Sequence, residues 1–128
     1  MIDHIGIGAA DFARSRGFYD AALAALQIRP LMELTPAQTG GYHGIGYGAD
    51  GKPFFWLSNG EPRGAGIHVA FTAPSRAAVD AFYHAALAAG GKNNGAPGLR
   101  PHYHPHYYAA FVFDPDGINV EAVCHSPQ

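Results

Sequence analysis

The stretch HIGIGAADFARSRGFYDAALAAL at residues 4–26 has a second copy, HVAFTAPSRAAVDAFYHAALAAG, at residues 68–90. The two align without a gap at an offset of 64, and 10 of their 23 positions are identical. Alanine-rich segments match one another easily, so the shared histidine and the shared Phe-Tyr pair carry more weight than the shared alanines. The chain is therefore predicted to consist of two copies of one structural unit.

The copies divide the chain at the segment GEPRGAG, residues 60–66, into units of about 1–63 and 64–128. A unit of this size is too small to bury its own apolar face. We therefore expect the two units to share one core and to form a single domain.

The composition is that of a globular protein, with 48% hydrophobic and 14% charged residues in 128. A net charge of -2 and an isoelectric point near 6.4 offer no basic surface for a phosphate backbone, so no nucleic acid partner is expected. No apolar run is long enough to span a membrane, and the N-terminus MIDHIGIG lacks the features of a signal peptide. The single cysteine, Cys124, agrees with a reducing compartment, and a cytoplasmic location is expected.

Each unit is predicted to run strand, helix, strand, strand, strand. In the first unit the helix is expected to begin after Asp11 as N-cap and to end near Gln27, and an Asp50-Gly51 turn is expected to join the last two strands. The expected strands are Ile2–Gly8, Ile28–Leu34, Gly41–Gly48 and Pro53–Ser58.

The second unit repeats this order with a less regular middle. Its first strand is expected at Gly66–Thr72, and its helix is expected to begin after Ser75 and to end at Gly90-Gly91. The segment KNNGAPGLRPHYHP, residues 92–105, is rich in Pro and Gly and is expected to hold one poor strand inside a long loop. The last strands are expected at Tyr107–Phe113 and Ile118–Cys124, around a DPDG turn. The predicted fold is α+β, two βαβββ modules with mainly antiparallel sheets.

Side-chain alternation places three polar residues on the faces opposite the bulky apolar ones. His4 shares a face with Gly6 and Gly8, and His68 shares a face with Ala70 and Thr72. Glu121 is expected on one face with Asn119 and Val123, opposite Ile118, Val120 and Ala122. The bulky faces are the natural bed for the helices, so the histidine faces are expected to border an open concave space.

Two imidazoles and one carboxylate form a ligand set suited to a divalent transition metal, with coordination positions left for water or substrate. A metal would also explain a carboxylate within an apolar strand, because burying it alone is costly. A single strand histidine is, however, more often hydrogen-bonded or half-exposed than a ligand, and Glu121 could face solvent on an edge strand. The residues themselves leave both interpretations open.

Three motifs in order resemble the vicinal oxygen chelate superfamily, which includes glyoxalase I, extradiol dioxygenases, fosfomycin-resistance thiol transferases and bleomycin-resistance proteins. They are HIGIGAADFARSRGFY at residues 4–19, GIHVAF at 66–71 and FDPDGINVEAV at 113–123. The resemblance implies paired βαβββ modules whose sheets curl around a cavity. It also implies one divalent metal ion (Fe, Mn, Ni or Zn) held by His4, His68 and Glu121, and a homodimer, with the site built within one chain or across two.

Departures from the family patterns bear on the reaction. Glyoxalase I has a further glutamate ligand in the first module, where alignment places Leu57 or Phe55 in this chain. Extradiol dioxygenases have a catalytic tyrosine where this chain has Phe111. The phosphonate contacts of the fosfomycin type are not evident, and bleomycin-type sequestering proteins lack the three metal ligands that this chain has.

The stretch RPHYHPHYY, Arg100 to Tyr108, lies on the loop leading into the next strand and is expected beside the cavity. Histidine can move protons near neutral pH, tyrosine can donate to an oxyanion, and arginine can hold a carboxylate. His106 and Tyr108 are the candidate catalytic residues. Arg100, His104 and the cavity-wall residue Phe55 are the candidate substrate contacts. A polar surface loop or a dimer contact is the alternative.

The sequence thus predicts a metal-dependent enzyme acting on a small oxygen-bearing substrate, with lyase, isomerase, thiol transferase and dioxygenase reactions left open. The metal would act as a Lewis acid on a substrate that chelates it through adjacent oxygens. The alternative is a small-molecule-binding or resistance protein of the same fold without catalysis. A third is a metal with a purely structural role or an evolutionary relic.

Overall fold

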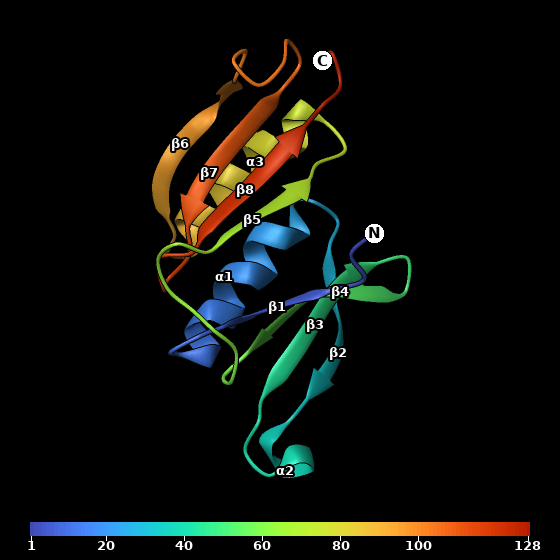
Figure 1. The fold of residues 1–128 in the computed structure, drawn as a ribbon, viewed down its shortest axis with the longest axis vertical. Coiled ribbons are helices and arrows are strands. Elements are labelled where there is room, and N and C mark those ends of the chain that lie inside the picture. The colour runs from blue at the N-terminus through green and yellow to red at the C-terminus, as the bar shows by residue number, and fades with distance from the viewer.

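The computed structural model describes residues 1–128, and each of its two four-stranded sheets is built from one unit (Figure 1). The strand orders are β1-β4-β3-β2 and β5-β8-β7-β6. Strand β1 is parallel to its neighbour β4, and β5 is parallel to its neighbour β8, whereas the other neighbouring strands are antiparallel. This confirms the predicted α+β fold of tandem βαβββ modules. The elements are β1 (Ile5–Gly8), α1 (Phe12–Ala24), β2 (Arg29–Leu34), α2 (Pro36–Thr39), β3 (Gly44–Ala49), β4 (Lys52–Ser58), β5 (His68–Thr72), α3 (Arg76–Ala88), β6 (Lys92–Leu99), β7 (Tyr108–Phe113) and β8 (Asn119–Cys124).

Both helices begin where the sequence predicts. The side chain of Asp11 accepts a hydrogen bond from the backbone N–H of Arg14, and Ser75 does the same for Ala78. Helix α1 ends at Ala24, before the expected Gln27, because Gln27 takes a left-handed conformation with φ 63° and turns the chain toward β2. None of the helices has the length and apolar character needed to cross a membrane.

Two elements differ from expectation. Strand β6 is a continuous edge strand of eight residues where a poor strand in a long loop was expected. Its register with β7 shifts twice, between Asn93 and Gly98, and this irregularity accommodates Pro97 at the sheet edge. The one-turn helix α2 was not predicted. The sequence does contain its signal, since Thr35 and Gln38 form a capping box around Pro36.

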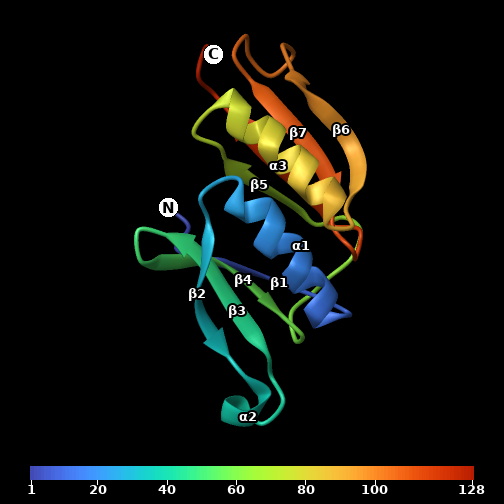
Figure 2. The same ribbon diagram turned by 180° about the vertical axis from the view of Figure 1, so that it is seen from behind.

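The two helices lie on the same side of the molecule, each against its own sheet (Figure 2), and they pack against each other. A single cluster of 24 buried hydrophobic residues runs through both modules. At its centre the ring of Phe55 on β4 meets the ring of Phe71 on β5 edge to face, with 5.1 Å between centroids. Tyr19 of α1 lies 5.1 Å from the same Phe55 ring. The modules therefore share one core.

No helix covers the opposite faces of the two sheets (Figure 1). On β5 the alternate residues His68, Ala70 and Thr72 are exposed. On β2, which has no buried residue, Met32 is 51% exposed although its side chain is apolar. Within one chain the two sheets are therefore not closed around a common cavity, and their uncovered faces look outward.

The DPDG turn of the second module, residues 114–117, is anchored to the first module. Tyr19 donates a hydrogen bond of 2.6 Å to Asp114 Oδ2, and both residues are buried. The neighbouring Asp116 accepts hydrogen bonds from the backbone N–H of Ala10 and from the Ser15 hydroxyl. Burial raises the pKa of Asp114. The turn that sets the register of β7 and β8 thus also holds the modules together.

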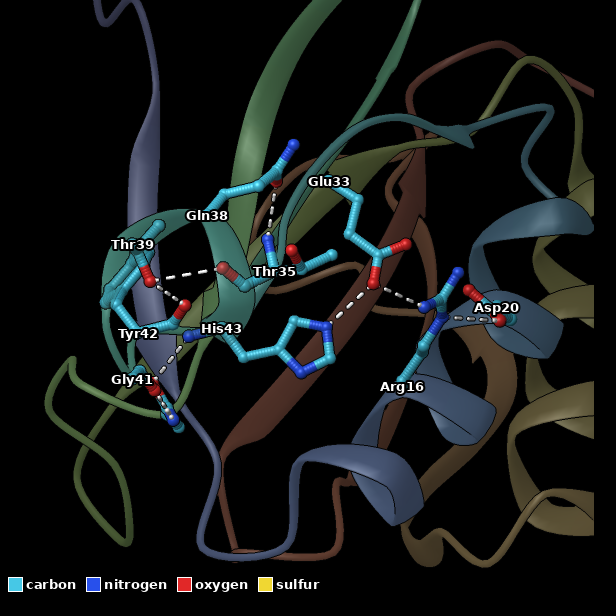
Figure 3. Close-up of polar contacts among 10 residues, drawn as sticks. Arg16, Asp20, Glu33, Thr35, Gln38, Thr39, Gly41, Tyr42 and His43 are labelled. Carbon is cyan, nitrogen blue, oxygen red and sulfur yellow. Dashed lines mark hydrogen bonds and ion pairs between the residues drawn. The ribbon is translucent and has the colours of Figure 1, made fainter.

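The hairpin that carries α2 is tied back to α1 by a second polar network (Figure 3). Glu33 accepts hydrogen bonds from His43 Nε2 at 2.7 Å and from the Arg16 guanidinium at 3.2 Å. The His43 ring stacks on Phe12, with 3.8 Å between centroids. The hydrogen bond from His43 lowers the pKa of Glu33, with a smaller effect from Arg16. These contacts orient β2 and β3 and hence the uncovered face of the first sheet.

We expect Tyr19→Phe to lower the free energy of unfolding by about 2 kcal/mol, because it removes a hydrogen bond to a buried carboxylate. Tyr83→Phe is the matched control, since Tyr83 is the repeat equivalent of Tyr19 but its hydroxyl bonds to the exposed Asn93. Its expected loss is below about 0.5 kcal/mol. Urea unfolding of the two variants measures the difference. Equal losses would show that the contact between Tyr19 and Asp114 does not join the modules.

Candidate metal centre

The central pair of the candidate site is His68 and Glu121, on the neighbouring parallel strands β5 and β8. Glu121 lies directly opposite Ala70, two residues along β5 from His68, so both side chains rise from the same sheet face. His68 Nε2 lies 2.9 Å from Glu121 Oε1. The carboxylate is 1% exposed, whereas the imidazole side chain is 49% exposed. The buried Glu121 is thus in contact with a histidine that reaches solvent. Both residues lie on the sheet face that strand alternation predicts for them.

The second carboxylate oxygen is occupied by Tyr107, whose hydroxyl donates a hydrogen bond to Glu121 Oε2. Tyr107 is the last loop residue before β7, and it shares the parity of Phe111, which pairs with Glu121 across the ladder. Burial, together with this hydrogen bond to the carboxylate, raises the pKa of the Tyr107 phenol. Both oxygens of the buried carboxylate are therefore partnered, as its burial requires.

A carboxylate oxygen facing an imidazole nitrogen, with access from solvent on the imidazole side, fits two positions of a divalent metal site. One chain offers no more than this pair, because no group of three His, Cys, Asp or Glu side chains lies close enough to hold a metal ion. His4 lies apart from the pair. It precedes β1 on the other sheet, and its Nδ1 is 2.6 Å from Asp3 Oδ1.

His4 instead lines an open recess on the uncovered face of the first sheet. The recess is bordered by His4, Ile5, Gly6, Leu34, Tyr42, Trp56 and Glu61. Through the repeat, the position of His4 on the first sheet corresponds to that of His68 on the second. The expected ligands thus lie on equivalent faces of two sheets, two on one and one on the other.

Strand register corrects the sequence alignment at one point. The repeat places Gly6 at Ala70, and Ala70 pairs with Glu121, whereas Gly6 pairs with Trp56. The first-module counterpart of Glu121 is therefore Trp56 and not Leu57 or Phe55. The offset between modules grows from 64 at the first strands to 65 at the last, since 121 − 56 = 65. The position still carries no carboxylate.

Four other residues that the sequence singled out lie in or beside the loop 100–107. Arg100, just after β6, donates hydrogen bonds of 2.8 Å to the β6 carbonyls of Gly98 and Ala96, and its guanidinium lies 5.4 Å from the Phe111 ring centroid, on the Glu121 face. His104 Nε2 faces His125 Nδ1 at 2.9 Å, and His106 is exposed. Tyr108 points to the opposite face, where its hydroxyl donates to Asp80 on α3 at 2.7 Å.

The structure therefore joins Tyr107, and not Tyr108 or His106, to the candidate pair. The signal was present in the sequence, because a strand paired through the DPDG turn puts residues 107, 109 and 111 on the face of Glu121. Phe55, a candidate substrate contact, lies in the shared core at 1% exposure. A contact between Phe55 and substrate stays an untested prediction.

Comparison with known proteins agrees with this fold. A glyoxalase/bleomycin resistance protein from Albidiferax ferrireducens T118 is 30% identical, covering 98% of this chain and 99% of that one, with a TM-score of 0.79. Glyoxalase I from Zea mays is 23% identical over 96% of this chain, with a TM-score of 0.71, and this chain spans 45% of it. An enzyme of the glyoxalase/bleomycin resistance protein/dioxygenase family from Burkholderia phytofirmans PsJN is 18% identical over 97% of this chain and 98% of that one, with a TM-score of 0.69. The last two likenesses bear on the fold alone.

No curated protein sequence matches the chain significantly. Residues 1–122 do match a family model, that of the Glyoxalase/Bleomycin resistance protein/Dioxygenase superfamily. The match extends from Met1 into the final strand as far as Ala122 and so includes His4, His68 and Glu121. The chain therefore belongs to the glyoxalase/bleomycin resistance protein/dioxygenase superfamily.

Proposed function

We propose that this protein is a divalent-metal-dependent enzyme that acts on a small substrate with two adjacent oxygens. The observation that carries the proposal is the buried Glu121 carboxylate, whose Oε1 is directed at His68 Nε2 on the sheet face that no helix covers. A sheet surface does not need a buried acid for stability, since an apolar residue there costs less. A site that binds a divalent metal does need an ionised carboxylate beside a neutral imidazole.

The third ligand is His4 from a second copy of the chain. Within one chain His4 and the pair of His68 and Glu121 lie on separate uncovered faces. If the first sheet of one copy covers the second sheet of the other, a two-fold axis generates two equivalent sites. Each site then contains His68 and Glu121 of one subunit and the partner subunit's His4. The same contact would cover the exposed apolar side chains of β2.

The chain's own residues have separate tasks in such a site. His68 and Glu121 hold the metal, which supplies Lewis-acid polarisation of a chelating oxygen. Tyr107 holds the far carboxylate oxygen and keeps Oε1 directed at the imidazole. Arg100, beside Phe111 on the same face, is placed to pair with an acidic group of the substrate. Trp56 and Phe111 replace the groups that glyoxalase I and ring-cleaving enzymes use, which argues against both reactions in their usual form.

The second candidate function is capture of an apolar small molecule without chemistry. It is favoured by the recess on the first sheet, where Leu34, Tyr42 and Trp56 offer apolar surface to a ligand. The two functions differ in their response to chelators. A binding protein keeps its ligand affinity when metal is removed, whereas the proposed enzyme loses its activity.

Metal content measured by plasma mass spectrometry tests the proposal. Untagged protein is expected to hold about one metal ion per subunit, and Glu121→Gln is expected to lower metal affinity by on the order of tenfold or more. Glu33→Gln is a matched control, because Glu33 also pairs with a histidine at 2.7 Å but on the exposed α2 hairpin. It should leave metal content unchanged. Absence of metal from the wild type after reconstitution with iron, manganese, nickel and zinc would sink the proposal.

Tyr107→Phe tests the task assigned to the phenol. It leaves a buried carboxylate oxygen unpartnered, so we expect the metal-free protein to lose about 1–3 kcal/mol of unfolding free energy. Metal affinity is expected to fall about tenfold, as for loss of an outer hydrogen bond to a ligand. Competition with a chromophoric chelator measures the second effect.

The control is Tyr103→Phe in the same loop, where the tyrosine is 60% exposed. This variant should match the wild type in stability and in metal affinity. Identical behaviour of the two variants would show that the hydroxyl of Tyr107 does not position Glu121.

A further inference from the structure

We propose that Trp56 determines substrate class at this site, and that the preferred substrate carries its two adjacent oxygens on a flat unsaturated group such as an aromatic ring. The inference rests on the proposed metal site and adds the part of the substrate that does not touch the metal. It is carried by the position of one indole, by the way the backbone accommodates it, and by what surrounds it.

The indole stands at a defined place in the repeat. Trp56 pairs with Gly6 on one side and with Gly46 on the other, on the uncovered face of the first sheet. In the second module the equivalent position is Glu121. The indole therefore lies beside His4 where a carboxylate lies beside His68. A substrate bound between these two faces meets an aromatic surface on one side and the charged pair on the other.

The backbone of β3 holds the indole flat. A Cβ atom at Gly46 would come within 2.8–2.9 Å of three atoms of the six-membered ring of Trp56, closer than such atoms approach. At Gly44 a Cβ atom would lie 2.7 Å from the ring of Tyr42. The rings of Trp56 and Tyr42 therefore lie directly on the backbone of β3 at its two glycines, Gly46 and Gly44. One face of each ring packs on the backbone, which orients the rings along the sheet.

Apolar side chains border one side of the indole. Met32 pairs with Gly46 and Leu34 with Gly44, so their side chains border Trp56 and Tyr42 on the same sheet face. Three of the residues that line the recess have titratable side chains, namely His4, Tyr42 and Glu61. The Glu61 side chain lies over Gly6, with its Cγ 3.5 Å and its carboxylate carbon 3.7 Å from the Cβ position there. The free face of a flat indole favours offset stacking with a second π-system.

Three hydroxamic acids separate the parts of this inference. Acetohydroxamate, cyclohexanecarbohydroxamate and benzohydroxamate carry the same pair of metal-binding oxygens on a methyl group, a puckered apolar ring and a flat ring. Calorimetry with the zinc-reconstituted full-length protein gives their dissociation constants. Benzohydroxamate is expected to bind about tenfold more tightly than acetohydroxamate, and cyclohexanecarbohydroxamate to fall between them.

The chain has one tryptophan, so its fluorescence reports on this position without labelling. Benzohydroxamate is expected to quench the fluorescence of the wild type, and acetohydroxamate to leave it nearly unchanged. Trp56→Leu should remove the preference for the flat ring, and Trp56→Phe should retain most of it. The quenching result stands on the wild type alone, should either variant fold poorly.

Equal affinity for the three probes in the wild type would overturn the inference while leaving the metal site intact. Survival of the flat-ring preference in Trp56→Leu would overturn it as well. Failure of all three probes to bind the zinc-loaded protein more tightly than the metal-free protein would instead contradict the proposed metal site, and the inference would fall with it.

Discussion

The structure depends most on how it accommodates one charged group, the carboxylate of Glu121, within the apolar strand β8. Both oxygens of this group have a partner: His68 faces Oε1, and the Tyr107 hydroxyl donates to Oε2. An unpartnered carboxylate at 1% exposure would cost several kcal/mol, so the loop before β7 and the register of β5, β7 and β8 are constrained together. The His68 imidazole is the member of this cluster that is exposed to solvent, so a ligand can reach the cluster from the sheet face that no helix covers.

The shared core determines what that face can meet. Because α1 and α3 pack against each other, and Phe55 packs on Phe71, the two modules join through their helix sides and leave both opposite faces open. His4 and Trp56 lie on one open face, and His68 with Glu121 on the other. A second copy of the chain can bring these faces together, whereas a single chain with this core cannot. The proposed function therefore requires a dimer, because the proposed metal site is complete only when two copies of the chain meet.

Much of this arrangement could be predicted from the repeat, because strand alternation and helix caps are local properties. The caps at Asp11 and Ser75 and the common face of His68 and Glu121 follow from it. The contact between Tyr107 and Glu121 depends on strand register, and so does the correspondence between Trp56 and Glu121. One inserted residue shifts that register between the modules, so the sequence alignment pointed to Leu57 or Phe55. The separation of His4 from the pair depends on how the modules pack, which no local pattern encodes. The outcome of that packing was left open by the sequence.

Metal binding by mixed dimers tests directly whether the metal site is shared between two subunits. Neither His4→Ala nor Glu121→Gln should hold metal alone, but a dimer with one subunit of each has one intact site, built from the wild-type His4 of one and the wild-type pair of the other. After joint unfolding and refolding, random pairing makes half of the dimers mixed, so metal content should return to about a quarter of the wild-type value. No recovery of metal in a mixture shown to contain mixed dimers would contradict a site shared between subunits.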